Sequence, residues 1–207
     1  MKHLFQSKTM AAWIVMLLVA VCALPERVAA QIFYQEDFNY SVGDLLSQGD
    51  WVRYGSNAEA PIQVLDKQLS YPGYNDDAPA KCVKLTSTKS GEDFMARFTD
   101  DDDGVKSGNL YFSALINVES QPQGNVYVMA FVPRTKKSVI IAGINPVELG
   151  RVYIGEGSKD DEVKIGVERG AANPVFSDTP LKLNQTYLVV LRYEINSTEK
   201  GKDNVYL

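Results

Sequence analysis

Carboxylates, tyrosines and amides are the side chains of this chain that could do chemistry, because histidine is almost absent. The only histidine among the 207 residues is His3, which lies in the N-terminal segment described below. Serine and cysteine triads, histidine acid–base catalysis and histidine-ligated zinc or iron all need an imidazole ring. The sequence therefore excludes these chemistries for residues 31–207.

Paired carboxylates are the remaining route to catalysis, since glycoside hydrolysis needs two of them about 5–9 Å apart and no histidine. On a strand, two carboxylates must lie an even number of positions apart to face one groove. Glu36 and Asp37 are adjacent and point to opposite faces. Residues 92–93 begin a strand, and residues 160–162 lie at a loop tip. No pair meets the requirement, and we predict that the chain is not an enzyme.

A structural calcium ion is the one cofactor that the sequence suggests, and none is required. Acidic side chains lie at loops and strand ends, where their oxygens suit Ca²⁺. The candidate ligands are Glu36, Asp37, Asp101, Asp103 and Asp203. The acidic loop at 100–103 lacks the spacing of a helix–loop–helix calcium site, so the alternative is a solvated acidic tip.

Two long strand patterns carry the candidate ligand-binding residues. Residues 109–119 alternate, and residues 125–132 are apolar on both faces, which is typical of a strand that is covered or that lines a groove. The turn at 121–124 predicts that the two strands form a hairpin. Sugar rings stack on aromatic faces, and amides bind hydroxyl groups. The candidates are Tyr111, Asn117, Tyr127 and Phe131. The alternative is that a neighbouring loop covers them.

The first 30 residues read as a secretory signal peptide. Lys2 and Lys8 precede an apolar run at 10–24 that is short for a membrane span, and small residues at 28 and 30 predict cleavage after Ala30. The remaining 177 residues suit a single domain, 31–207. No later stretch approaches the ~20 apolar residues of a membrane helix. We therefore expect an exported protein, extracellular or at the cell surface, with no transmembrane segment.

Charge and cysteine content exclude one class of partner and one kind of covalent link. Without residues 1–30, 18 basic and 25 acidic residues remain, which gives a net charge of −7. Nucleic acid binding is not expected, because phosphate recognition needs a basic face. Only Cys82 remains after cleavage, so no intramolecular disulfide can form.

The fold class follows from a period of two residues along nearly the whole chain. Short apolar runs alternate with clusters of Gly, Pro, Asn and Asp, which predicts an all-β antiparallel β-sandwich, most simply a jelly roll. Residues 69–74 (LSYPGY) predict a type II turn, in which Pro72 fixes the first central position and Gly73 supplies a positive φ at the second. Residues 203–207 begin a strand at the chain end, so we expect a domain truncated at its C-terminal strand.

Several short motifs follow one another in a recognisable order. They are residues 36–40 (EDFNY), 43–46 (GDLL), Trp51, 61–64 (PIQV) and 69–74 (LSYPGY), followed by 108–120, 150–153 (GRVY), 185–190 (QTYLVV) and 203–207. This order resembles secreted jelly-roll domains of Bacteroidetes in the concanavalin A-like lectin/glucanase superfamily, with a laminin-G-like sandwich. Family members usually continue into a sorting domain for type IX secretion. The laminarinase-like branch has a Glu-x-Asp-x-x-Glu strand pattern, which is not found here.

Together, these features lead to one functional interpretation and two alternatives. The resemblance implies a non-catalytic exported surface module with lectin-like or adhesive binding, whose partner is an extracellular glycan or a host or cell-surface protein. The first alternative is a carbohydrate-active hydrolase with an atypical carboxylate pair. The second is a passive structural spacer in a larger surface protein.

Overall fold

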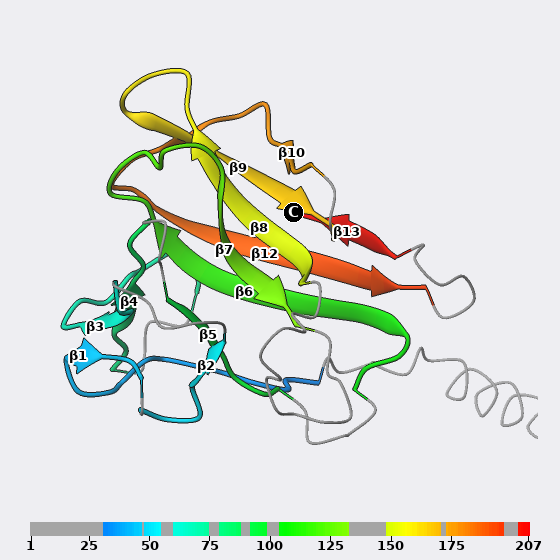
Figure 1. Ribbon diagram of the computed structural model, residues 1–207, viewed down its shortest axis with the longest axis horizontal. Helices are drawn as coiled ribbons and strands as arrows, with labels where there is room; N and C mark the ends of the chain where they lie inside the picture. The colour runs from blue at the N-terminus through cyan, green and yellow to red at the C-terminus, as the bar shows by residue number, and fades with distance from the viewer. Residues whose placement is uncertain are drawn as a thin grey trace, which may run out of the picture. The chain divides into compact units, whose positions relative to one another are not determined.

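The computed structural model (Figure 1) divides the chain into two units, Met1–Phe33 and Tyr34–Leu207. The described residues are 31–46, 48–54, 60–74, 79–87, 92–98, 104–132, 148–170, 173–196 and 203–207. The predicted signal peptide and the predicted calcium ligands Asp101 and Asp103 lie outside these residues. All described strands belong to the second unit.

The described residues form strands and no helix, which confirms the all-β prediction. The thirteen strands among them are β1 (Gly43–Asp44), β2 (Val52–Tyr54), β3 (Gln63–Leu65), β4 (Cys82–Lys84), β5 (Asp93–Met95), β6 (Gly108–Asn117), β7 (Val126–Phe131), β8 (Leu149–Glu156), β9 (Glu162–Glu168), β10 (Val175–Phe176), β11 (Leu181–Lys182), β12 (Thr186–Ile195) and β13 (Asn204–Tyr206). No helix in the described part of the chain has the length and apolar character needed to cross a membrane.

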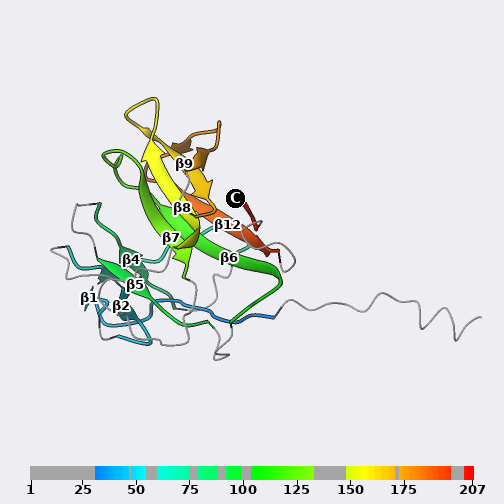
Figure 2. The same cartoon turned by 45° about the vertical axis from the view of Figure 1, so that its right-hand side comes forward.

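Two larger antiparallel sheets hold most of the strands (Figure 2). The first has the order β10-β9-β8-β7, with β11 also paired to β9, and is called the β8 sheet below. The second has the order β13-β12-β6 and is called the β12 sheet. Strands β6 and β12 pair over ten residues, from Thr186 opposite Asn117 to Ile195 opposite Gly108.

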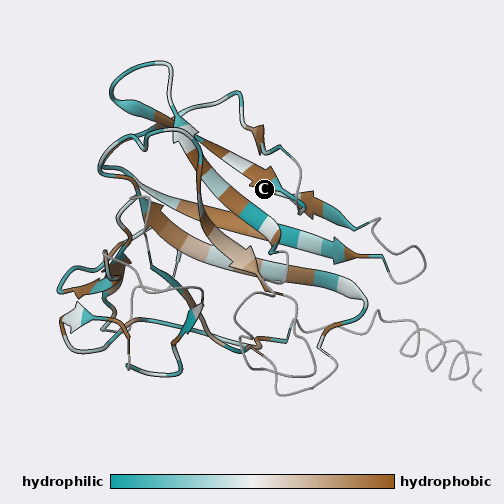
Figure 3. Ribbon diagram, viewed as in Figure 1, coloured by the Kyte–Doolittle hydropathy of each residue, from teal (hydrophilic) through white to brown (hydrophobic). Residues whose placement is uncertain are grey.

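The main hydrophobic core lies between these two sheets. Its buried residues are Val152 and Ile154 of β8, Val163 and Ile165 of β9, and Val189 and Leu191 of β12. Within each strand they are two positions apart, so each strand turns one face to the core. Figure 3 shows hydrophobic residues along β6, β8, β9 and β12. The two sheets therefore pack face to face, as in a β-sandwich.

The predicted hairpin of residues 109–119 with residues 125–132 is wrong. β6 pairs with β12, and β7 pairs with β8, so the connection between β6 and β7 crosses from one sheet to the other. Its start is held by the Val118 carbonyl, which accepts from Asn184 N at 2.8 Å. Its middle is held by the Gln121 side-chain amide, which donates to the Glu162 carbonyl at 2.7 Å. These bonds stabilise a connection that crosses between the two sheets, in place of the tight turn of a hairpin.

A second correction concerns the faces of β7. The register against β8 shifts twice, between Tyr127 and Met129 and between Met129 and Phe131. Such bulges change which face a side chain occupies. Tyr127 lies beside Tyr153, with ring centroids 6.2 Å apart, whereas Phe131 contacts the core residue Tyr193 at 6.1 Å. Residues 125–132 are apolar on both faces, as expected, but their side chains do not alternate strictly between those faces.

Residues before β6 form two smaller sheets, β1-β3-β4 and β2-β5, around their own core of Leu45, Ile62 and Val64. The predicted type II turn at residues 71–74 is confirmed. Tyr74 N donates to the Tyr71 carbonyl at 3.0 Å, and Gly73 has a φ of 79°. This turn contacts the β12 sheet, because the Tyr74 hydroxyl lies 3.2 Å from the Ser113 hydroxyl of β6.

The assignment of faces in β12 can be tested with two neighbouring residues. Leu191 is 1% exposed, and Val190 is 45% exposed. We expect Leu191→Ala to lower the free energy of unfolding by about 2–5 kcal/mol, because it leaves a cavity in the core. Val190→Thr should change it by about 0.5 kcal/mol or less. Urea denaturation measures both, and equal losses would contradict the assignment.

Candidate functional site

The outer face of the β12 sheet carries a row of side chains from three strands. Arg192 of β12 lies directly opposite Tyr206 of β13 on one side and Tyr111 of β6 on the other. Residues opposite one another in antiparallel strands point to the same face of the sheet. Leu191 and Tyr193, on either side of Arg192, are buried, so this face is the one turned away from the core. We call Tyr111, Arg192 and Tyr206 the Tyr–Arg–Tyr row.

The geometry of this row is held by one carboxylate. The Arg192 guanidinium lies over the Tyr206 ring, 3.9 Å from its centroid. The Tyr206 hydroxyl donates to Glu194 Oε2 at 3.2 Å, and the Asn204 amide donates to the same oxygen at 3.4 Å. Glu194 therefore orients the ring on which Arg192 stacks, and this stacking is a favourable cation–π contact.

The aromatic surface of the row is accessible. Tyr111 is 64% exposed and Tyr206 is 44% exposed. Ser113, which is bonded to Tyr74, lies two positions from Tyr111 on the same face. At the other end of β6, the Asn117 amide nitrogen donates to the Thr186 hydroxyl at 3.4 Å, and its buried Oδ1 has no partner among the described residues. Two rings, a cation and polar groups thus share one face.

The outer face of the β8 sheet carries a different group, an ionic cluster around Arg151. Arg151 donates to Glu148 Oε2 at 2.7 Å and to Glu168 Oε2 at 3.2 Å. Tyr153 also donates to Glu168 Oε2, at 2.8 Å. The Glu168 side chain is 1% exposed. Desolvation lowers the pKa of Arg151, but the hydrogen bonds to Tyr153 and Glu148 outweigh it and raise that pKa above its usual value. The positive charge of Arg151 is therefore paired within the cluster, as a buried charge must be.

Asp93 extends this cluster through a tyrosine. The Tyr127 hydroxyl donates to Asp93 Oδ2 at 3.1 Å, and the Arg151 guanidinium lies 5.8 Å from the centre of the Tyr127 ring. Partial desolvation raises the pKa of Asp93, and the negative charge of Glu148 adds to the effect, whereas the bond from Tyr127 opposes it. A carboxyl group with a raised pKa beside a second carboxylate is the arrangement in which acid catalysis occurs.

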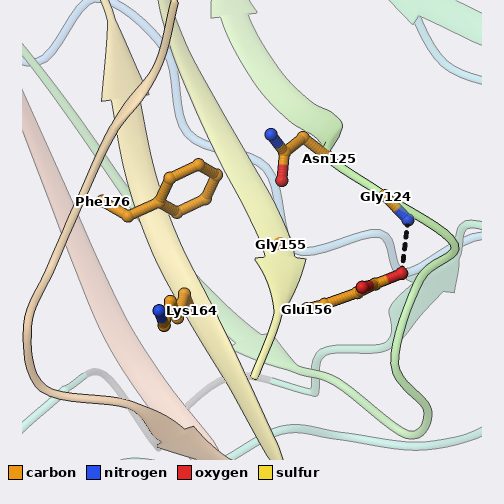
Figure 4. A pocket seen from close by; sticks show the side chains of 6 residues that line it. All are labelled: Gly124, Asn125, Gly155, Glu156, Lys164 and Phe176. Atoms are coloured by element: carbon orange, nitrogen blue, oxygen red, sulfur yellow. Dashed lines mark hydrogen bonds between the residues drawn. The ribbon is translucent and has the colours of Figure 1, made fainter. Parts of the chain in front are cut away.

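The hollow shown in Figure 4 lies farther along the same face of the β8 sheet. It has a volume of about 190 Å³ and is lined by Gly124, Asn125, Gly155, Glu156, Lys164 and Phe176. Glu156 accepts from Gly124 N at 2.9 Å. The Phe176 ring covers Gly155 so closely that a Cβ there would lie 2.8 Å from it. The volume is below the roughly 300–1,000 Å³ of ligand pockets. We therefore interpret the hollow as a gap beside the packed Phe176 ring and not as a ligand site.

The predicted calcium ligands that the structure describes are not brought together. Glu36 Oε2 accepts from Tyr40, Trp51 and Tyr34, at 2.8, 2.9 and 3.1 Å, and its Oε1 accepts from Phe38 N. Asp37 accepts from Asn39 N. Asp203 accepts from Tyr193 and from Asn196 N. No group of three metal-ligating side chains occurs among the residues that the structure describes.

The four predicted ligand-binding residues do not share one surface either. Tyr111 and Asn117 lie on the outer face of the β12 sheet, Tyr127 lies in the other sheet, and Phe131 packs against the core. Sequence reasoning missed Arg192 and Tyr206 as partners of Tyr111. The alternation of residues 186–195 places Arg192 on the face of the strand that is turned away from the core. The pairing of β12 with β6 and β13 is also needed to bring Tyr111 and Tyr206 beside it.

No family model, curated protein or solved structure matches this chain. The class of protein is therefore defined by the fold and the sites alone. It is an all-β chain in which two antiparallel sheets pack face to face, and each sheet carries a polar and aromatic group on its outer face.

The tyrosines bonded to Glu36 predict a pH dependence of stability. Desolvation and the hydrogen bond to Glu36 raise the pKa of Tyr40 to about 12. An unfolded tyrosine titrates near pH 10, so the stabilisation by Tyr40 is complete below about pH 10 and is lost as the pH rises towards 12. We expect Tyr40→Phe to be less stable than the wild type at pH 8, and this difference to shrink above pH 10. Denaturation curves from pH 8 to 11.5 measure it, and a constant difference would refute the assignment.

Proposed function

We propose that this protein is an exported, non-catalytic binding module that holds a glycan on the outer face of its β12 sheet. The observation that carries the proposal is the Tyr–Arg–Tyr row. Exposed tyrosine rings offer apolar faces for sugar rings, and the polar groups beside them can bond hydroxyls. Neighbouring strands lie ~5 Å apart, so the row extends across ~10 Å of sheet, enough for more than one sugar ring.

A protein partner and a passive spacer are the competing proposals for the same chain. Protein interfaces centre on buried apolar and aromatic anchors with few charges. The row instead has a cation between two rings, and the next pair of side chains beside it is Glu194 and Asn204. A spacer has no need for exposed tyrosines around a stacked arginine. These features favour glycan binding.

Export and fold family belong to the same proposal. The signal-peptide pattern of residues 1–30 and the motif order from Glu36 to Leu207 support a secreted concanavalin A-like jelly roll of the Bacteroidetes type, displayed at the cell surface by type IX secretion. The two packed antiparallel sheets are consistent with such a fold. We expect the exported protein to begin at Gln31, and mass spectrometry of the exported protein measures this.

The binding face can be tested by removing single tyrosines. We expect Tyr111→Ala and Tyr206→Ala each to weaken glycan binding on an array about tenfold, because each removes a stacking surface. Tyr127→Ala is the matched control, since Tyr127 is an exposed tyrosine of the other sheet. Loss of binding in the control alone would move the site to the β8 sheet. No binding by the wild type to any glycan would refute the proposal.

A second candidate function, glycoside hydrolysis, is favoured by one observation. Glu148 and Glu168 bind the same guanidinium, so two carboxylates lie near each other, and glycoside hydrolysis requires a pair of neighbouring carboxylates. However, each carboxylate is bonded to Arg151, and Glu168 is almost fully buried. A catalytic acid must hold and release a proton beside the substrate, which these ion pairs oppose.

We therefore expect no release of reducing ends when the protein is incubated with the glycans that it binds. Colorimetric detection of reducing sugar over several hours measures this. Release that is abolished by Glu148→Gln or by Glu168→Gln but retained in Tyr111→Phe would establish catalysis at the carboxylates around Arg151 and overturn the non-catalytic proposal. Release that survives both substitutions would not come from this pair of carboxylates.

A further inference from the structure

Arg192 differs from the other half-buried arginines in the described residues. Arg53 donates to the buried carboxylate of Glu92 at 2.7 Å, and Arg151 donates to Glu148 and Glu168. Arg192, in contrast, has no carboxylate partner among the described residues; its buried Nε has no hydrogen-bond partner there, which is also true of Arg151 Nε. The Arg192 guanidinium instead stacks on the ring of Tyr206. The row therefore holds a cation whose charge is not neutralised within this part of the chain.

The nearest acidic side chain on this face is used for another purpose. Glu194 lies two positions along β12, but its Oε2 accepts from Tyr206 and Asn204. It fixes the ring below Arg192 and does not form an ion pair with the guanidinium. A partly desolvated guanidinium without a counter-charge is costly, and a cation–π contact offsets only part of that cost. The arrangement is thus pre-organised for an anion supplied from outside.

We infer that Arg192 binds the acidic group of an anionic glycan, a sugar carboxylate or sulfate ester, while Tyr111 and Tyr206 contact the sugar rings. This inference rests on the proposed glycan-binding function and names the class of ligand. Guanidinium groups bind oxyanions through two parallel hydrogen bonds, which gives orientation as well as attraction. The net charge of −7 expected for residues 31–207 would repel an acidic polymer, so a local cation is needed to bind one.

The test compares acidic oligosaccharides with neutral oligosaccharides of the same length, by calorimetry on the purified protein. Uronic acid oligomers and sulfated oligomers form separate arms, so that carboxylate and sulfate recognition are distinguished. We expect the wild type to bind at least one acidic series about tenfold or more tightly than the neutral series in 50 mM salt. The preference should shrink in 500 mM salt, because salt screens an exposed charge.

Three variants separate a specific role of Arg192 from a structural one. Arg192→Gln should reduce the binding of the acidic series to the level of the neutral series. Arg192→Lys keeps the charge without the planar fork and should retain part of the preference. Arg97→Gln, which removes an exposed arginine outside the row, is the matched control and should retain all of it. Thermal melting of each variant checks that the fold is intact.

The outcomes distinguish the inference from the function on which it rests. Equal binding of acidic and neutral series, or a preference that survives in Arg192→Gln, overturns the inference and leaves glycan binding standing. If Arg192→Gln does not fold, a preference fully retained in Arg192→Lys at 500 mM salt overturns the inference. Absence of binding to every series overturns both.

Discussion

The alternation of side chains along β12 is the constraint on which both the core and the candidate site depend. Val189, Leu191 and Tyr193 are buried, while Val190 is exposed and Arg192 lies on the same outer face. A slip of one residue in the pairing with β6 would exchange the two faces and place Arg192 in the core. Burial of the aliphatic set therefore fixes the register, and the register in turn places Tyr111, Arg192 and Tyr206 in one row.

Single carboxylates organise the rest of the polar structure in the same way. Glu36 gathers two tyrosines and a tryptophan, Glu92 joins Arg53 to Ile62 N, and Glu194 orients Tyr206. A buried or half-buried carboxylate is stable when several donors satisfy it, and each donor is then fixed in position. In a chain whose expected exported part has no histidine and no disulfide, these carboxylates supply the links that join separate segments.

The all-β class, the type II turn at residues 71–74 and the buried face of β12 were predictable, because each depends on local conformation or on a period of two. The pairing of β6 with β12 was not, because sequence patterns give the faces of a strand but not its neighbour. The position of Phe131 was missed for a further reason: two register shifts in β7 break the alternation that the prediction assumed. Arg192 and Tyr206 were missed as a site because they lie 14 residues apart and meet only through strand pairing.

The two outer faces show why an arginine beside tyrosines is not by itself a binding site. Arg151 also lies near two tyrosines, Tyr127 and Tyr153, but its charge is balanced by Glu148 and Glu168, and the guanidinium and these two carboxylates are largely closed to solvent. Such a group stabilises the sheet that contains it. In the Tyr–Arg–Tyr row, the available carboxylate is bonded to the tyrosine and not to the arginine. The guanidinium donors of Arg192 therefore remain available for a ligand on the β12 sheet, whereas those of Arg151 on the β8 sheet are taken up by its own carboxylates.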